Sequence, residues 1–289
     1  MKGSKLAFDA NKIVKILYRP FSKQYFYFDK IITHRPYQNG YIFGYDGKFK
    51  NKAIYFNVSS PSFCTVAADC IAASGTLLIG GGTTQSVPLT RYDDKGNSYE
   101  NITDWGLAQF REKYEGNGSQ KFSDEREKVE FYTNKKGFRI NKNDIFHYVY
   151  AVLNNPTYRK KYETNLKRDF PRIPMYKDFW KWSEYGKQLM DLHINYEKAK
   201  PFALKLFEVK EINKKANQKE IFSVATEPEA MFSRKAKVKV KLRADKEAGE
   251  IELDEITTLR GIPKEAWEYK LGNRSALEWI LDQYKEKKY

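Results

Sequence analysis

The sequence predicts an α+β protein, because its hydrophobic pattern changes along the 289 residues. In the first hundred residues, short aromatic and aliphatic runs are separated by Gly, Pro, Asn and Ser, which is typical of strands and turns. From Asn141 onward, apolar residues recur with the period of a helix. After residue 234, charged and apolar residues alternate, and a helix-capping pattern follows. We therefore expect a β-rich N-terminal portion, a helical middle, and a small C-terminal β-hairpin plus helix.

The N-terminal portion is expected to contain short strands and one helix. Residues 80–82 are a glycine triplet with neither a lysine nor a helix signal after it, so a turn between strands is favoured over a phosphate-binding loop. Residues 101–105 open a helix to about Tyr114, with Thr103 or Asn101 as its N-cap. The strands are predicted at Ile13–Tyr18, Gln24–Asp29, Lys52–Val58, Phe63–Ile71 and Thr76–Ile79.

Three helices are expected in the middle of the chain. His147 and His193 lie in apolar stretches of these helices, where packed, hydrogen-bonded histidines are favoured over catalytic ones. The aromatic residues of the third helix are expected in the core rather than as a platform for stacked bases. The helices cover Asp144–Leu153, a basic stretch that begins with Asn155 as N-cap and Pro156 and runs through Lys167, and Asp178 to about Ile194.

The C-terminal alternation predicts a hairpin with opposite charges on its two strands. After a turn at 244–249, Glu250, Glu252 and Asp254 continue the alternation of the preceding basic strand. Neutralisation across the hairpin is therefore favoured over contact with DNA phosphates. Ser275 and Glu278 form a capping box for a last helix, which extends to Lys285. The basic strand carries Lys235, Lys237, Lys239, Lys241 and Arg243 at every second position.

Composition is compatible with a polyanionic partner, although many basic cytoplasmic proteins bind no nucleic acid. Lys and Arg number 52 against 37 for Asp and Glu, which gives a net charge of +15. A cationic surface attracts nucleic acid, because neutralising phosphates releases counterions. No apolar run is long enough to span a membrane, and the first thirty residues hold no signal-peptide core, so we expect a cytoplasmic protein. Cys64 and Cys70 are too few for a disulfide scaffold or a cysteine-based zinc site.

Catalytic motifs are absent from the sequence. It has no P-loop, no Gly-x-Ser-x-Gly elbow, and no Asn-Pro-Pro-Tyr or Asp-Pro-Pro-Tyr motif of the kind that amino-methyltransferases use. The histidines at 34, 147 and 193 are far apart, and none has a second ligand at metal spacing. We therefore expect no catalytic residue, no metal site and no cofactor in this chain.

Several sequence blocks occur in a fixed order over nearly the whole chain. They are Tyr18-Arg-Pro-Phe21, Asn101-Ile-Thr-Asp-Trp-Gly-Leu107, Asp144-Ile-Phe-His-Tyr-Val-Tyr-Ala-Val-Leu153, Asn155-Pro-Thr-Tyr-Arg159, Asp169-Phe-Pro-Arg-Ile-Pro174, Gly186-Lys-Gln-Leu-Met-Asp-Leu-His193 and Tyr269-Lys-Leu-Gly-Asn-Arg-Ser-Ala-Leu-Glu-Trp279. In these blocks the sequence resembles the C-terminal target-recognition (specificity) region of type ISP restriction–modification enzymes and their helicase-like relatives.

The resemblance implies a role and a context. In that family, long polypeptides join a nuclease, a helicase-type ATPase and an adenine methyltransferase to this C-terminal region, and those parts use Mg²⁺, ATP and S-adenosylmethionine. The chain then looks like an excised domain or a truncated gene product. Its implied partners are double-stranded DNA and the methyltransferase, helicase and nuclease domains of the same polypeptide, with no membrane and no small-molecule substrate. We expect a β-rich DNA-recognition portion at 1–115, an exposed insertion or hinge at 116–140, a helical scaffold and docking portion at 141–200, and a small sheet plus C-terminal helix at 201–289.

Candidate DNA contacts follow from residue type and placement. A duplex reader needs Arg, Asn, Gln and hydroxyl side chains on loops that project from a rigid sheet. The loops at 33–40 and 83–86 supply Arg35, Gln38, Asn39, Thr83, Thr84 and Gln85 as base contacts. For each, the alternative is an ordinary surface side chain. Arg19 is a phosphate candidate that could equally hold a carboxylate inside the fold. The other phosphate candidates are Lys48, Lys50, Arg91, Lys160 and Lys161.

Two alternative functions stay open. One is a non-catalytic interaction module with only non-specific DNA affinity, for which binding would vanish near physiological salt. The other, less favoured, is a complete methyltransferase or nuclease with unrecognised motifs, which would bind S-adenosylmethionine or nick DNA with Mg²⁺.

Overall fold

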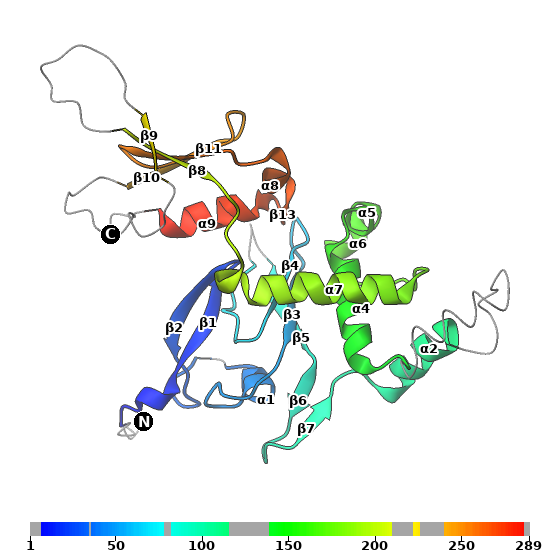
Figure 1. Ribbon diagram of the computed structural model, residues 1–289. Helices are drawn as coiled ribbons and strands as arrows, with labels where there is room; N and C mark the ends of the chain where they lie inside the picture. The colour runs from blue at the N-terminus through cyan, green and yellow to red at the C-terminus, as the bar shows by residue number, and fades with distance from the viewer. Residues whose placement is uncertain are drawn as a thin grey trace, which may run out of the picture. The chain divides into compact units, whose positions relative to one another are not determined.

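The computed structural model confirms the α+β class and describes residues 7–34, 36–77, 82–115, 139–209, 222–225 and 240–285 (Figure 1). The chain divides into two compact units, one of residues 1–19 and 23–197 and one of residues 20–22 and 198–289. The β-rich and helical portions expected from the sequence both fall in the first unit. The roles assigned to the four portions of the sequence (DNA recognition, hinge, scaffold and C-terminal sheet) stay a prediction.

Antiparallel strands make up the first half of the first unit. A 3₁₀ turn (Ala10–Lys12) leads into the β1–β2 hairpin, and a second hairpin pairs β6 with β7. Between them lies a three-stranded sheet in the order β4-β3-β5. The strands are β1 (Ile13–Arg19), β2 (Ser22–Tyr27), β3 (Ala53–Val58), β4 (Thr65–Ala68), β5 (Thr83–Pro88), β6 (Thr90–Tyr92) and β7 (Ser98–Glu100), and a short helix α1 covers Asn39–Phe43.

Helices α2 and α5 begin at their predicted N-caps, Thr103 and Asn155. Helix α4 begins at Lys142, two residues earlier than expected, with a capping box of Asn141 and Asp144. The prediction of a single basic helix through Lys167 is wrong, because the helix is interrupted at Tyr162 and forms two short helices, α5 and α6. The helices are α2 (Asp104–Tyr114), α4 (Lys142–Asn154), α5 (Pro156–Lys161), α6 (Glu163–Leu166) and α7 (Phe179–Ile194), followed by a 3₁₀ turn at Tyr196–Lys198.

One core joins the sheet to the helices. Ile54, Phe56 and Val58 of β3 are buried in the same cluster as α4 and α7, whereas Tyr55 lies on the other face of the strand. Helix α7 approaches α4 closely at Gly186, where a β-carbon would lie 1.8 Å from the carbonyl oxygen of His147. Helices cover one face of the sheet. On the other face Tyr55 is also buried, and its hydroxyl donates to the Cys70 carbonyl at 2.9 Å.

The second unit is a five-stranded antiparallel sheet with two helices. Its strand order is β10-β11-β12-β8-β9, and Ile251, Ile262 and Trp267 form its core. The elements are β8 (Lys205–Val209), β9 (Phe222–Ala225), β10 (Val240–Asp245), β11 (Glu250–Asp254), β12 (Thr257–Arg260), α8 (Lys264–Glu268), the short pair β13 (Lys270–Leu271) and β14 (Arg274–Ser275), and α9 (Ala276–Tyr284), which carries the predicted capping box at Ser275.

The predicted charged hairpin is present, but its ion pairing differs from the expectation. Arg243 faces Glu252 in the register, as expected. Glu250, however, pairs with Arg260 of the next strand at 2.7 Å rather than with the basic strand. Strand β10 also extends to Asp245, so the turn is shorter than 244–249. Lys235, Lys237 and Lys239 lie outside the described residues, as does the side chain of Lys241.

Two other strand predictions need correction. Strand β4 covers only Thr65–Ala68 of the predicted Phe63–Ile71. Thr76 and Leu77 lie in a turn instead of a strand, because the Thr76 hydroxyl bonds to the carbonyl oxygens of Leu17 and Ala73 and closes the chain on itself. Residues 78–81 lie outside the described residues.

Candidate nucleic-acid interface

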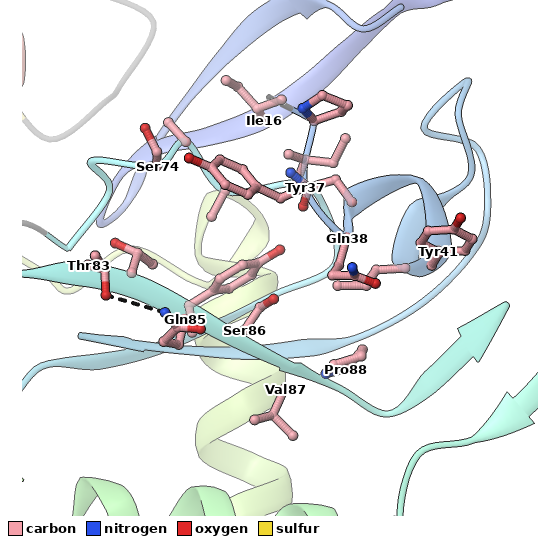
Figure 2. A pocket seen from close by; sticks show the side chains of 18 of the residues that line it. Ile16, Tyr37, Gln38, Tyr41, Ser74, Thr83, Gln85, Ser86, Val87 and Pro88 are labelled. Carbon is pink, nitrogen blue, oxygen red and sulfur yellow. Dashed lines mark hydrogen bonds between the residues drawn. The ribbon is translucent and has the colours of Figure 1, made fainter. Parts of the chain in front are cut away.

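The two segments predicted to contact bases line one cleft, although about forty residues separate them. The cleft has a volume of about 1000 Å³ and lies on the face of the β3–β5 sheet that the helices leave free (Figure 2). Residues 33–34, 36–39 and 41 form one side and residues 82–88 the other. The structure thus brings Gln38, Asn39, Thr83, Thr84 and Gln85 to one place, together with the phosphate candidate Arg91.

Strand β5 is the open edge of the sheet and forms one border of the cleft. Directly paired residues of antiparallel strands share a face, so Ser86 lies beside Tyr55 on the cleft side. Gln85 is paired with Phe56 and shares the opposite face with Thr83 and Val87, and Figure 2 shows Ser86 and Val87 on opposite sides of the strand. The open edge lets side chains from both faces of β5 border the cleft.

The prediction of a loop at 83–86 is therefore wrong, because these residues form most of an edge strand. Gln85 donates from its side-chain nitrogen to the Thr83 hydroxyl at 3.3 Å, which fixes the amide along the strand. The Thr84 hydroxyl is buried and has no hydrogen-bond partner among the described residues. Thr83 is exposed and Gln85 is partly exposed on this edge strand. The assignment of Thr83, Thr84 and Gln85 as base contacts stays a prediction.

The predicted loop at 33–40 is also partly regular. Gln38 is the exposed residue before α1, and Asn39 is the first residue of that helix. Gln38 makes no side-chain capping bond, so its amide is available to a ligand. Arg35 lies outside the described residues.

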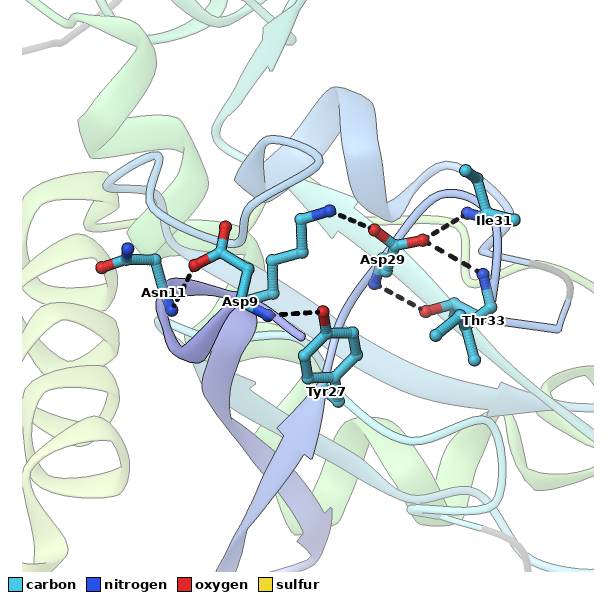
Figure 3. A network of polar contacts seen from close by, with 8 residues as sticks. Asp9, Asn11, Tyr27, Asp29, Ile31 and Thr33 are labelled. Carbon is cyan, nitrogen blue, oxygen red and sulfur yellow. Dashed lines mark hydrogen bonds and ion pairs between the residues drawn. The ribbon is translucent and has the colours of Figure 1, made fainter. Parts of the chain in front are cut away.

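A polar network around Asp29 shapes the chain leading to this segment (Figure 3). The buried Asp29 carboxylate accepts hydrogen bonds from the Ile31 and Ile32 amides, at 2.7 and 3.1 Å, and pairs with Lys12. The Thr33 hydroxyl accepts from the Asp29 amide at 3.0 Å. The Lys12 hydrogen bond, followed by the backbone amides, holds the pKa of Asp29 below its usual range. A fixed turn at 29–33 therefore positions the residues that enter the cleft.

Aromatic side chains that sequence analysis did not single out form much of the cleft wall. Tyr37 is 66% exposed and has a left-handed backbone with a φ of 49°, which is strained for a side chain of this size. Tyr41, Tyr55 and Phe26 also line the cleft. The hydrogen bond with Tyr45 and the nearby Asp94 raise the pKa of Tyr41 to about 12, so it keeps its proton. The sequence did hold one indication that Tyr37 lies at the site: it stands between Pro36 and the two candidate amide residues, Gln38 and Asn39.

The phosphate candidates fall into three groups. Arg91 is exposed at the cleft, and Lys48 and Lys50 are exposed on the loop before β3. Lys160 and Lys161 are exposed on α5 and do not line the cleft.

Arg19, in contrast, is held inside the fold. Its guanidinium donates to the carbonyl oxygens of Tyr18 and Gly75, at 3.0 and 2.9 Å, and lies over the Tyr18 ring. The alternative expectation is that Arg19 holds a carboxylate inside the fold, but its partners are backbone carbonyls. A contact between Arg19 and a DNA phosphate stays a prediction.

The cysteines and the histidines outside the cleft are buried or partly buried. The prediction of a buried, hydrogen-bonded histidine is confirmed for His193, which bonds through Nδ1 to the Tyr150 hydroxyl, and burial lowers its pKa to about 4. Burial raises the pKa of the Cys64 thiol to about 12 and that of Cys70 to about 11, so neither is an activated nucleophile. Within the described ranges there is no group of three or more potential metal ligands. Of the helices described, none is both long and apolar enough to cross a membrane.

Comparison with known proteins gives the family of this chain. Residues 1–289 match the family model of the type ISP C-terminal specificity domain. The chain belongs to that family. Among curated proteins, none matches the sequence.

Solved structures agree with this assignment. The chain is 37% identical to a DrdV–DNA complex determined by cryo-electron microscopy, with a TM-score of 0.76 over 98% of this chain and 24% of that one. It is 26% identical to a nuclease-deletion mutant of the type ISP restriction–modification enzyme LlaGI in complex with a DNA substrate mimic, with a TM-score of 0.68 over 100% of this chain and 22% of that one.

A third structure supports the fold alone. The ATP-dependent type ISP restriction–modification enzyme LlaBIII bound to DNA is 24% identical, with a TM-score of 0.69 over 98% of this chain and 16% of that one. The chain thus spans a quarter or less of the length of each of these proteins.

Proposed function

We propose that this chain recognises a specific sequence of double-stranded DNA as the target-recognition domain of a type ISP restriction–modification enzyme. It would direct adenine methylation and cleavage that other domains of the parent polypeptide perform. The observation that carries the proposal is the cleft, where amides and hydroxyls from two distant segments meet beside Arg91. The family assignment and the DNA bound in the related structures support it.

The side chains at the cleft fit direct readout of base edges. Gln and Asn amides can donate to and accept from adenine in the major groove, and hydroxyls can bond to any base. Gln38 and Gln85 enter from opposite sides of the cleft, so each would face a different position of the site. Exposed Arg91, Lys48 and Lys50 would neutralise phosphates and set the register of the protein on the duplex.

The proposal assigns neither a catalytic step nor a cofactor to this chain. Its support is the absence of catalytic motifs from the sequence, the burial of His193 and Cys64, and the raised pKa values of both cysteine thiols. S-adenosylmethionine, ATP and Mg²⁺ would serve the methyltransferase, helicase and nuclease parts of the parent.

Alanine substitutions at the cleft test the proposal. The variants Gln38→Ala and Gln85→Ala should each relax the preferred sequence at one or two positions, with a loss of discrimination of about 1–3 kcal/mol at the affected base pair. The preference is measured by selecting a randomised duplex library with the purified chain and sequencing the bound fraction.

Gln24→Ala is the matched control, because Gln24 is also exposed but does not line the cleft. An unchanged preference in both cleft variants, with intact folding, would contradict the assignment of this cleft. A change in Gln24→Ala as large as in the cleft variants would contradict it as well.

A further inference from the structure

A second basic surface lies on the helical side of the first unit, and none of its residues lines the cleft. It comprises α5, α6 and residues 167–178, which connect α6 to α7 (Figure 1). Residues 156–178 contain seven basic side chains and three acidic ones. Two of the basic side chains have structural roles. Arg159 bonds to Leu153 and Asn154, and Lys167 pairs with Glu163 at 2.6 Å.

The remaining five cations are exposed and uncompensated. They are Lys160, Lys161, Arg168, Arg172 and Lys177. Lys161 lies over the Tyr162 ring, and none of the five forms an ion pair with a residue that the structure describes. The two lysines were already phosphate candidates from the sequence, whereas the three cations of the connecting segment were not.

The connecting segment has no helix or strand, yet the core holds its backbone at several points. The Tyr158 hydroxyl donates to the Arg172 carbonyl at 2.9 Å, and the Tyr148 hydroxyl donates to the Pro174 carbonyl at 2.7 Å. Tyr148 also accepts from the Tyr176 amide, and Tyr114 donates to the Tyr176 carbonyl at 2.6 Å. These buried hydroxyls fix the path of the segment, so its cations are presented at set positions at a low entropic cost of binding.

The segment also adjoins the face of the sheet that carries Gln85. Phe170 packs edge-on against Phe56 of β3, with ring centroids 5.7 Å apart, and Phe56 is paired with Gln85 on the same face. From Arg168 to Lys177 the backbone spans at most about 30 Å, which is less than one turn of B-DNA. A duplex lying along β5 therefore has a row of cations available beside the cleft.

We propose that α5, α6 and residues 167–178 form a second DNA-contacting surface, which binds phosphates of the duplex and does not read its sequence. This inference rests on the proposed function, because it assigns the same duplex to both surfaces. The surface sets affinity and salt dependence, and the cleft sets the preferred sequence.

The test is a triple variant of the full chain, Arg168→Ala, Arg172→Ala and Lys177→Ala, assayed for duplex binding between about 50 and 200 mM salt. The slope of log K against log salt should become shallower by about 0.9 for each phosphate that the variant no longer neutralises, or roughly 2 to 3 in total. The enriched sequence from library selection should stay the same. Urea unfolding checks that the variant is folded.

Lys113→Ala, Lys187→Ala and Lys198→Ala form the matched control, because they remove the same charge from exposed positions elsewhere. Equal slope changes in the two triple variants would overturn the second surface, since total charge alone would explain them. An unchanged slope in the first variant would overturn it while leaving the proposed function intact. A changed sequence preference would make these residues part of the readout and overturn the division of roles. A chain that binds no duplex at 50 mM salt would overturn both proposals.

Discussion

At the scale of single residues, buried hydroxyl and imidazole groups link the elements of the core. Tyr150 accepts a hydrogen bond from the Ala67 amide of β4 at 2.9 Å, and its hydroxyl is also hydrogen-bonded to Nδ1 of His193 in α7. The Tyr150 side chain therefore joins the sheet to α7, and burial of the His193 ring favours its neutral form.

His193 predicts a stability change below neutral pH. Its pKa is lowered from 6.5 to about 4 in the folded chain, so between these values the unfolded state binds the extra proton. The free energy of unfolding should thus fall as pH decreases from about 6.5 to 4, by about 3 kcal/mol from this group. Urea unfolding of the wild type and His193→Gln across this range measures the effect.

The His193→Gln variant should lack this step while it keeps the acid dependence of the carboxylates. If the two proteins lost stability in parallel from pH 6.5 to 4, the protonation of His193 would not be linked to folding.

At the scale of elements, the sequence predicted those helices that have polar caps and apolar faces. The caps of α2, α5 and α9 were readable because Thr103, Asn155 and Ser275 stand where side chains can bond the first amides. Strand β5 was not readable, because an edge strand of Thr, Gln and Ser lacks the apolar alternation of a half-buried strand. These residues form a strand because they pair with β3, which is about thirty residues away in the sequence.

The same limit applies to the candidate site. Residue type selected Gln38, Asn39 and Gln85, and the structure places all three at one cleft. The exposure of Tyr37 depends on its left-handed backbone, and the turn at Asp29 is held in part by the distant Lys12, so residue type alone did not select either feature.

The close contact of α4 and α7 predicts opposite effects for two helical glycines. Gly186→Ala would place a β-carbon against the His147 carbonyl, so the helices must move apart, at an expected cost of about 1–3 kcal/mol or more. Gly106→Ala is the control, because the nearest atom there is 3.4 Å away and alanine favours the helix. It should stabilise the chain by about 0.5–1 kcal/mol. Thermal or urea unfolding measures both, and a neutral Gly186→Ala would contradict the observed packing of α4 on α7.

At the scale of the whole molecule, affinity and specificity are proposed to reside on different surfaces of the first unit. A net charge of +15 attracts any duplex, and this attraction weakens steeply with salt. Contacts to base edges depend much less on salt, so they should dominate discrimination as the ionic strength rises. Sequence preference that survives added salt is therefore the property that separates a target-recognition domain from a basic docking module.

Sequence-specific recognition is best tested by a library selection with the wild-type chain, in which salt is raised in steps from about 50 to 200 mM. A target-recognition domain should enrich one DNA sequence motif, and that enrichment should persist, or become sharper, at the higher salt. Binding that disappears over this range without any enriched motif would contradict the proposed function and would leave a module that binds DNA through charge alone.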